Sequence, residues 1–128
     1  MEPITIEATK SSPFIHIDPV NHMIQFKGES YPENAAKFFG PILSSISKFL
    51  TDSRASQVTV DMQVTYFNSS SSKALLNLFE MLENSVSEGK DIVVNWFYHP
   101  ENETALEAGE EFRDEVPSLT INLIETSS

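Results

Sequence analysis

The sequence contains no cysteine, so it can form neither a disulfide framework nor a thiolate metal site. It has only four glycines, which are too widely spaced for a Gly-rich phosphate-binding loop. The Gly-x-Ser-x-Gly motif of a nucleophile elbow is absent as well. The three histidines, His16, His22 and His99, lack the spacing of metal ligands. We therefore expect no metal, no cofactor and no enzyme activity.

Basic residues are also scarce. Eight Lys and Arg stand singly along the chain against 19 Asp and Glu, which gives a formal net charge of −11. Nucleic acid and anionic membranes repel such a surface, so we expect neither as a partner. The first residues lack the basic and apolar regions of a signal peptide, and no apolar run approaches the roughly 20 residues that span a bilayer. We expect a soluble, cytoplasmic protein that binds a protein or a small ligand.

The length of 128 residues fits one domain, since domains cluster at about 100–150 residues. Residues 1–11 lack periodicity and are expected to be a flexible N-terminal arm, followed by a single α/β domain at 12–128. Apolar periodicity predicts strands at 14–18, 22–27, 57–67, 91–98 and 118–124, and helices that open near 30, 70 and 100. The order ββαβαβαβ predicts a mixed, mainly parallel sheet with helices over at least one face.

Turn and capping residues indicate where these elements end. Gly28 is expected to end the second strand, and Ser30 with Glu33 matches a capping box that opens the first helix. Pro41 lies inside the apolar pattern of that helix and predicts a kink or a break. Gly89 is the expected C-terminal stop of the second helix.

The run of four serines at 69–72 follows a buried strand and begins a helix. The first N–H groups of a helix lack intrahelical partners, and the helix dipole is positive there, so this turn suits a phosphate that is either bound or covalently attached. Lys73 is the nearby cation in the sequence. Ser and Asn are also the commonest N-caps, so plain capping by Asn68 or a serine remains an alternative explanation.

Three motifs together resemble the bacterial SiaC family of regulatory phosphoproteins, from about Ser12 to Ile124. The motifs are Ser30-Tyr-Pro-Glu-Asn, Tyr66-Phe-Asn-Ser-Ser-Ser-Ser-Lys-Ala-Leu-Leu-Asn-Leu-Phe-Glu-Met-Leu-Glu and Trp96-Phe-Tyr-His-Pro-Glu-Asn-Glu. The resemblance implies a fold similar to that of anti-sigma-factor antagonists (SpoIIAA/STAS-like). It also implies that a cognate kinase phosphorylates a hydroxyl in the strand-to-helix turn and that a PP2C-type phosphatase removes the phosphate. In the best-known pathway the unphosphorylated form binds and activates an effector, a diguanylate cyclase.

The resemblance places the modified hydroxyl at Ser69. The family has a Thr there, after Asn, in an Asn-Thr-Ser-Ser pattern, whereas this chain has a serine. The register within the serine run leaves Ser70 as an alternative.

The three motifs all follow strands, so in a parallel sheet their helix starts should gather at one edge and form a partner surface around Ser69. Tyr31, Phe67 and Tyr98 are the candidate aromatic contacts, although Tyr31 and Tyr98 could instead be hydrophobic staples of their helices. The expected partner-binding residues are Tyr31, Pro32, Glu33, Asn34, Phe67, Asn68, Ser70, Ser71, Lys73, Tyr98, Pro100 and Glu101.

Two other functions fit the same turn. A small-ligand binding module would use the helix N-terminus to hold a free phosphate or nucleotide. A small enzyme would use a serine of the run as nucleophile, but the motif contains no visible base, so this reading ranks last.

Overall fold

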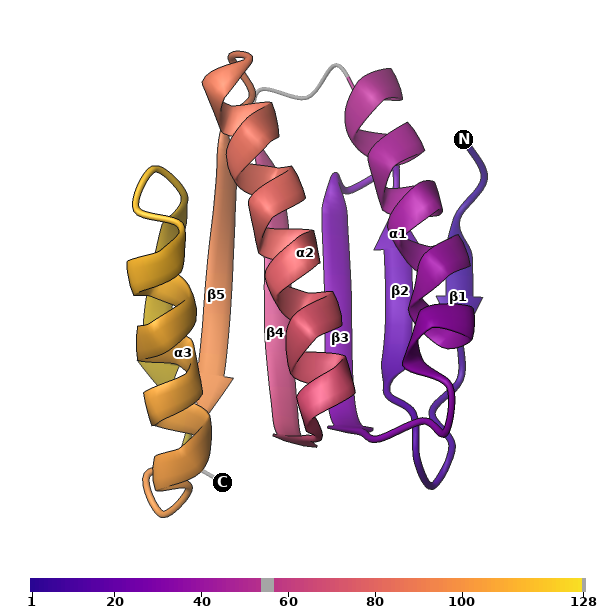
Figure 1. Cartoon of the computed structure of the whole chain (residues 1–128). Coiled ribbons are helices and arrows are strands. Elements are labelled where there is room, and N and C mark those ends of the chain that lie inside the picture. Colours follow the sequence, from indigo (N-terminus) through magenta and orange to yellow (C-terminus); the bar gives the residue numbers. More distant parts are fainter. Residues whose placement is uncertain (54–56, 128) are drawn as a thin grey trace.

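The computed structural model describes residues 1–53 and 57–127, which form one sheet and three helices (Figure 1). The strands are β1 (Ile4–Ile6), β2 (Phe14–Asp18), β3 (Met23–Ser30), β4 (Val58–Phe67), β5 (Ile92–Tyr98) and β6 (Thr120–Glu125). The helices are α1 (Ala35–Asp52), α2 (Ser69–Ser87) and α3 (Glu103–Glu115). The six strands lie in sequence order, with β1–β2 and β2–β3 antiparallel and the other three pairs parallel. The predicted mixed, mainly parallel sheet is confirmed, and its first predicted strands form an antiparallel pair.

All three helices lie on the same face of the sheet (Figure 1). The parallel strands follow one another across the sheet in sequence order. Because each β–α–β connection is right-handed, such an order places every connecting helix on the same side of the sheet. The core fills the space between the two layers. It includes side chains that alternate along the strands and are almost completely buried, among them Ile24, Val60, Met62, Val94 and Trp96.

An aromatic cluster joins α2 and α3 to the sheet. The ring of Trp96 lies 5.6 Å from that of Phe112 and 6.3 Å from that of Phe79, and its Nε1 donates a hydrogen bond to the carbonyl of Ala105 at 2.9 Å. Gly109 of α3 packs directly over this indole, since a Cβ at position 109 would lie 2.6 Å from the Trp96 Cδ1 atom. The glycine thus lets α3 approach the sheet closely.

Part of the predicted N-terminal arm forms a strand. Within the stretch expected to be a flexible arm, β1 pairs with β2, with Ile4 opposite Ile17 and Ile6 opposite Ile15. A three-residue strand is too short for its alternation to stand out in the sequence, and its pairing is made with a strand further along the chain.

The prediction that Gly28 ends the second strand is wrong. Gly28 has a φ of +115°, and β3 continues through it to Ser30. The register shifts at this point, because Gly28 pairs with Val64 but Glu29 pairs with Tyr66. Glycine inside a strand often marks such a bulge. From Tyr66 onward the bulge reverses which side chains of β4 face the helices.

The first helix begins later than predicted. Its N-cap is Asn34, whose side chain accepts a hydrogen bond from the Lys37 N–H at 3.0 Å, so the capping box of Ser30 and Glu33 is wrong. Pro41 does not break α1, which is one continuous helix. The residue before Pro41 is Gly40, which has no Cβ to clash with the proline ring in the helical conformation.

The other two helices lie close to their predicted positions. Helix α2 ends at Ser87, and Gly89, the predicted stop, follows the cap Glu88 with a φ of +103°. The N–H of Gly89 bonds to the Val86 carbonyl and that of Lys90 to the Ser85 carbonyl, which is the Schellman pattern. Helix α3 begins at Glu103, after the cap Asn102, rather than at Pro100. In the described part of the chain, no helix combines the length and apolar character needed to cross a bilayer.

Candidate functional site

Three asparagines cap the three helices at one edge of the sheet. The side chains of Asn34, Asn68 and Asn102 accept hydrogen bonds from the third N–H of α1, α2 and α3 at 3.0, 2.9 and 3.1 Å. Because β3, β4 and β5 are parallel, their carboxyl ends and these helix starts lie together, at the lower edge of Figure 1. The expected gathering of the three motifs at one edge is therefore what the structure shows.

The serine run is not uniform. Asn68 is the N-cap, and Ser69 and Ser70 are exposed at the first two positions of α2. Ser71 is fully buried, and its hydroxyl lies 2.8 Å from the hydroxyl of Ser30, which is also buried. Ser72 is half-buried. An enzyme approaching from solvent therefore meets the hydroxyls of Ser69 and Ser70 first and cannot reach that of Ser71 without opening the fold.

Within the described part of the chain, the start of α2 offers free N–H donors beside these hydroxyls. The Ser71 N–H is taken by the Asn68 side chain and the Ser72 N–H by the Asn68 carbonyl at 2.9 Å. The N–H groups of Ser69 and Ser70 are among the first of a helix, which have no intrahelical acceptor. The unpaired N–H groups and the positive end of the helix dipole together favour a negative group at this position.

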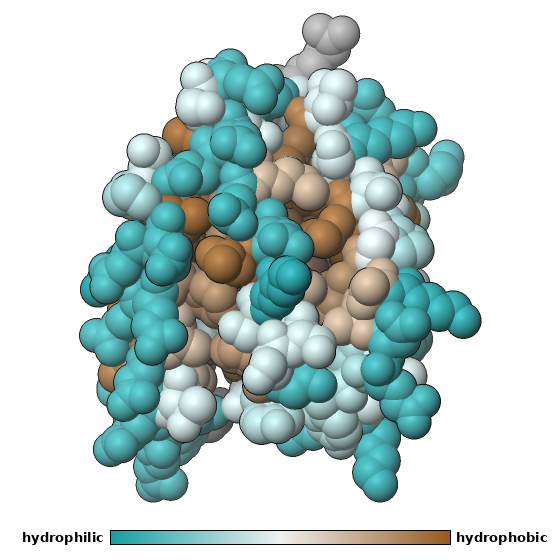
Figure 2. Space-filling view, viewed as in Figure 1, coloured by the Kyte–Doolittle hydropathy of each residue, from teal (hydrophilic) through white to brown (hydrophobic). Residues whose placement is uncertain are grey.

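Two hollows flank the start of α2. One, of about 530 Å³, is lined by Ser69, Lys73 and Glu115 among others and lies between α2 and α3. The other, of about 550 Å³, is lined by Glu33 and Ser70 among others, lies between α1 and α2, and also includes Lys73. Figure 2 shows hydrophobic surface in the furrows between the helices and hydrophilic surface on their outer sides. The exposed Lys73 therefore borders both hollows.

The three helix starts are tied to one another. The Asn68 N–H donates to the Ser30 carbonyl at 3.1 Å, and the Asn102 side chain donates to the Thr65 carbonyl at 3.0 Å. The rings of Tyr31 and Tyr66 meet edge to face, with their centres 5.8 Å apart. The segment that follows β3 and the loop that precedes α3 both contact the end of β4 next to Ser69.

Tyr66 is a surface aromatic that the sequence analysis missed. It is 53% exposed, whereas Phe67 turns inward, with its ring centre 6.1 Å from that of Phe112 and 6.2 Å, edge to face, from that of Trp96. Strict alternation from Val64 would place Tyr66 inside and Phe67 outside, but the bulge reverses them. Gly28 was the one signal in the sequence that could have indicated this.

The hydrophobic-staple interpretation of Tyr31 and Tyr98 is wrong. A staple residue immediately precedes the N-cap. With Asn34 and Asn102 as caps, that position belongs to Glu33 and Glu101, so neither tyrosine occupies it. Tyr31, Pro32 and Tyr98 are half-buried, and Glu33, Pro100 and Glu101 are exposed.

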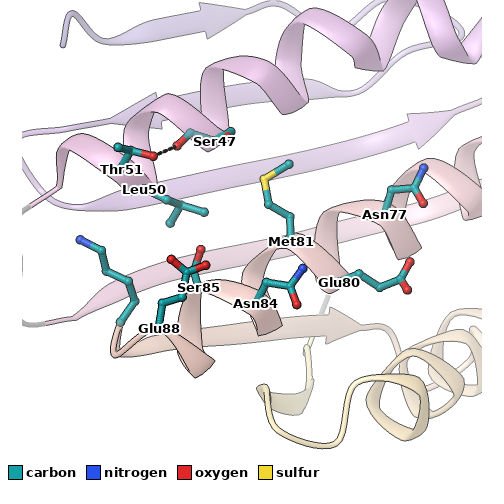
Figure 3. A pocket seen from close by; sticks show the side chains of 10 residues that line it. Ser47, Leu50, Thr51, Asn77, Glu80, Met81, Asn84, Ser85 and Glu88 are labelled. Carbon is teal, nitrogen blue, oxygen red and sulfur yellow. Dashed lines mark hydrogen bonds between the residues drawn. The ribbon is translucent and has the colours of Figure 1, made fainter.

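A larger hollow of about 660 Å³ lies between the C-terminal parts of α1 and α2 (Figure 3). Its lining includes Leu50, Met81, Glu80 and Asn84, and Thr51 there donates to the Ser47 carbonyl at 3.0 Å. Since Ser69 is the first residue of α2, this hollow is separate from the serine turn. Within residues 1–53 and 57–127, no three His, Asp or Glu side chains gather closely enough to hold a metal ion.

Residues 6–126 of the chain match the sequence profile of a known family, the SiaC family regulatory phosphoproteins. The chain belongs to the SiaC family. An uncharacterized protein of Pseudomonas aeruginosa (strain UCBPP-PA14) is 32% identical over 115 residues, which are 90% of each chain. These matches confirm the resemblance that the three motifs indicated.

Solved SiaC structures share the fold. SiaC of Pseudomonas aeruginosa superposes with a TM-score of 0.90 at 28% identity, covering 98% of this chain and 100% of that one. A second similar chain is in the crystal structure of the diguanylate cyclase SiaD in complex with its activator SiaC from the same organism, with a TM-score of 0.89 at 30% identity. That alignment covers 96% of this chain and 99% of the other.

Proposed function

We propose that this SiaC-family protein is a phosphorylation-gated switch for protein–protein binding. A cognate kinase phosphorylates Ser69, a PP2C-type phosphatase removes the phosphate, and the unphosphorylated form binds an effector such as a diguanylate cyclase. The observation that carries the proposal is the position of Ser69, an exposed hydroxyl at the first position of α2 beside unpaired N–H groups. The related SiaC is an activator bound to a diguanylate cyclase, which supports this choice of effector.

The surroundings of Ser69 support gating by charge. A phosphoserine carries about −1.5 to −2 charges at neutral pH. The hollow beside Ser69 already contains the carboxylates of Glu111, Asp114 and Glu115 against the single ammonium of Lys73. In the free protein the helix N-terminus and Lys73 offset part of the added charge. When an effector covers the turn, the phosphate must lose water in an acidic setting, which disfavours the complex.

The phosphorylation site is tested by incubating the chain with the kinase and ATP and locating added phosphate by peptide mass spectrometry. We expect modification of Ser69 in the wild type, and its loss in Ser69→Ala. Ser70→Ala is the matched control, because Ser70 is the next residue of α2 and is also exposed. Phosphate on Ser70 in the wild type would move the switch by one residue, and no phosphate on any residue of 69–72 would contradict the proposal.

Gating is tested by measuring effector binding to unmodified and phosphorylated protein. We expect the phosphorylated form to bind at least about tenfold more weakly, which corresponds to about 1.4 kcal/mol. Circular dichroism should show the same fold for both forms. Equal binding by the two forms contradicts gating. If inorganic phosphate or a nucleotide raises the melting temperature while no covalent change occurs, the ligand-binding alternative is favoured instead.

A further inference from the structure

Lys73 lies one helical turn after Ser69 on α2. Residues four apart on a helix are neighbours on its surface, with their Cβ atoms about 5–6 Å apart. Both side chains are exposed, and both line the hollow between α2 and α3. Because a lysine has a long, flexible stem, its ammonium can reach a group attached to the Ser69 hydroxyl.

The Lys73 ammonium is available for such a contact. It forms no salt bridge with any described residue, although three carboxylates on α3 line the same hollow, those of Glu111, Asp114 and Glu115. Among the described residues that line the two hollows beside the serine run, Lys73 alone is positively charged. A negative group on Ser69 therefore has one nearby cation, and that cation has no ion-pair partner to give up.

The surroundings also determine toward which helix a phosphate on Ser69 is drawn. The three carboxylates on α3 lie across the hollow and repel it. On α2, the first N–H groups lack intrahelical acceptors and the helix dipole is positive, so both attract it. Repulsion from α3 and attraction to α2 act in the same direction and bring the phosphate toward Lys73.

We propose that the phosphate of Ser69 pairs with the Lys73 ammonium and thereby reinforces the first turn of α2. The pairing rests on the proposed function, since Ser69 must be the modified residue. Phosphorylation can order or melt the start of a helix, depending on the charges around it. Here the ion pair spans one turn, so it holds the helix together. The switch then changes the charge of a turn that keeps its shape, and Lys73 is the residue that positions the phosphate.

Genetically encoded phosphoserine at position 69 of the full chain tests this pairing without the kinase. A nearby cation favours the dianion, so Lys73 should lower the second pKa of the phosphate, which is about 6 in an ordinary phosphoserine. In a phosphorus-31 NMR titration, Lys73→Met should raise this pKa by at least about 0.3, and added salt should shrink the difference. Lysine and methionine have similar helix propensities, so the substitution itself hardly affects α2.

Thermal denaturation gives a second measurement of the same pair. The change in melting temperature caused by phosphorylation should be about 1–2 °C more favourable in the wild type than in Lys73→Met. Lys37→Met is the matched control, because Lys37 is also exposed in the first turn of a helix at this edge but lines neither hollow. It should leave the pKa of the phosphate and the effect of phosphorylation as they are in the wild type.

Two outcomes overturn the inference. One is a phosphate pKa that is the same in the wild type and in Lys73→Met. The other is a change in Lys37→Met as large as that in Lys73→Met, because the net charge alone would then explain both. The proposed function fails separately, if the kinase leaves Ser69 unmodified, since the encoded phosphoserine does not depend on the kinase.

Discussion

The hydroxyl of Ser71 lies 2.8 Å from that of Ser30, and both side chains are buried. The two residues are 41 positions apart, and the bond fastens the start of α2 to the end of β3. Together with the bond from the Asn68 N–H to the Ser30 carbonyl, it holds the turn that carries Ser69 against the neighbouring strand. The exposed serines thus stand on a turn that a buried serine anchors.

We expect Ser71→Ala and Ser30→Ala each to lower the free energy of unfolding by about 1–3 kcal/mol, because each leaves a buried hydroxyl without its partner. The double variant should lose less free energy of unfolding than the two single variants lose together, since it leaves no buried hydroxyl without a partner. Urea denaturation of the four proteins gives the coupling energy. Additive effects would show that the two hydroxyls do not depend on each other.

Asn102 has two roles that a pair of variants can separate. Asn102→Ala removes the cap of α3 and the hydrogen bond to the Thr65 carbonyl. It should lower the free energy of unfolding by more than the roughly 1 kcal/mol that loss of a typical cap costs. Asn34→Ala is the matched control, because among the described residues the Asn34 side chain only accepts the capping hydrogen bond from Lys37. Thermal denaturation should give a lower melting temperature for Asn102→Ala than for Asn34→Ala. An equal loss would mean that the bond to β4 contributes nothing.

Gly109→Ala should destabilise the protein by about 1–3 kcal/mol, because the new methyl group has no room. It would lie 2.6 Å from Trp96 Cδ1 and 2.9 Å from a methyl of Leu123. Glu110→Ala, at the next and exposed position of the same helix, should change stability by no more than about 0.5 kcal/mol. Chemical denaturation measures both. A neutral Gly109→Ala would show that α3 can shift away from the indole.

The exposed ring of Tyr66 and the inward ring of Phe67 should respond differently to truncation. Tyr66→Ala should weaken effector binding at least about tenfold with little change in stability, as expected for an aromatic residue at the centre of an interface. Phe67→Ala should instead lower stability by about 3 kcal/mol, because it empties space beside Trp96 and Phe112. Titration with the effector and urea denaturation distinguish the two. Full binding by Tyr66→Ala would exclude the tyrosine from the interface.

Asp18, the last residue of β2, offers a pH test. The Asn21 side chain donates to its carboxylate at 2.7 Å, and the Asn21 and Val20 N–H groups also donate to it. The Asn21 side chain foremost, and then these N–H groups, hold the pKa of Asp18 below its usual value. A lowered pKa in the folded state favours folding above the unfolded pKa, and this contribution is lost as pH falls through the folded value.

Asn21→Ala should therefore raise the pKa of Asp18 toward the usual value, which a carbon-13 NMR titration of the carboxyl group measures. Asn77→Ala on α2 is the control and should leave the Asp18 titration unchanged. An unchanged Asp18 pKa in Asn21→Ala would contradict the assigned cause.

The order of the elements was predictable because long, strongly periodic segments dominate this chain. The strand before Asn68 and the helix after it were placed within one or two residues. The errors arose where a distant residue decides the outcome. Ser30 matches a capping motif, yet its hydroxyl is bound by Ser71, and Asn34 caps the helix instead. Local sequence patterns do not contain that contact.

The location of the candidate site in the sequence was predictable, but the side chains that it exposes were not. A run of serines at a strand-to-helix turn could be located from the sequence alone, and Asn68 could be named as a possible cap. Which serines face solvent depends on Ser71 turning toward β3, and which aromatic is exposed depends on the register shift beside Gly28. Both depend on contacts with β3 that are made by residues distant from it in the sequence.

The placement of all three helices on one side of the sheet has a consequence for stoichiometry. The edge that carries Ser69 and the broad open face are separate surfaces, so occupation of one does not block the other. A partner on the open face would leave the serine turn accessible, so binding at that face and modification of the turn could take place in the same molecule at the same time.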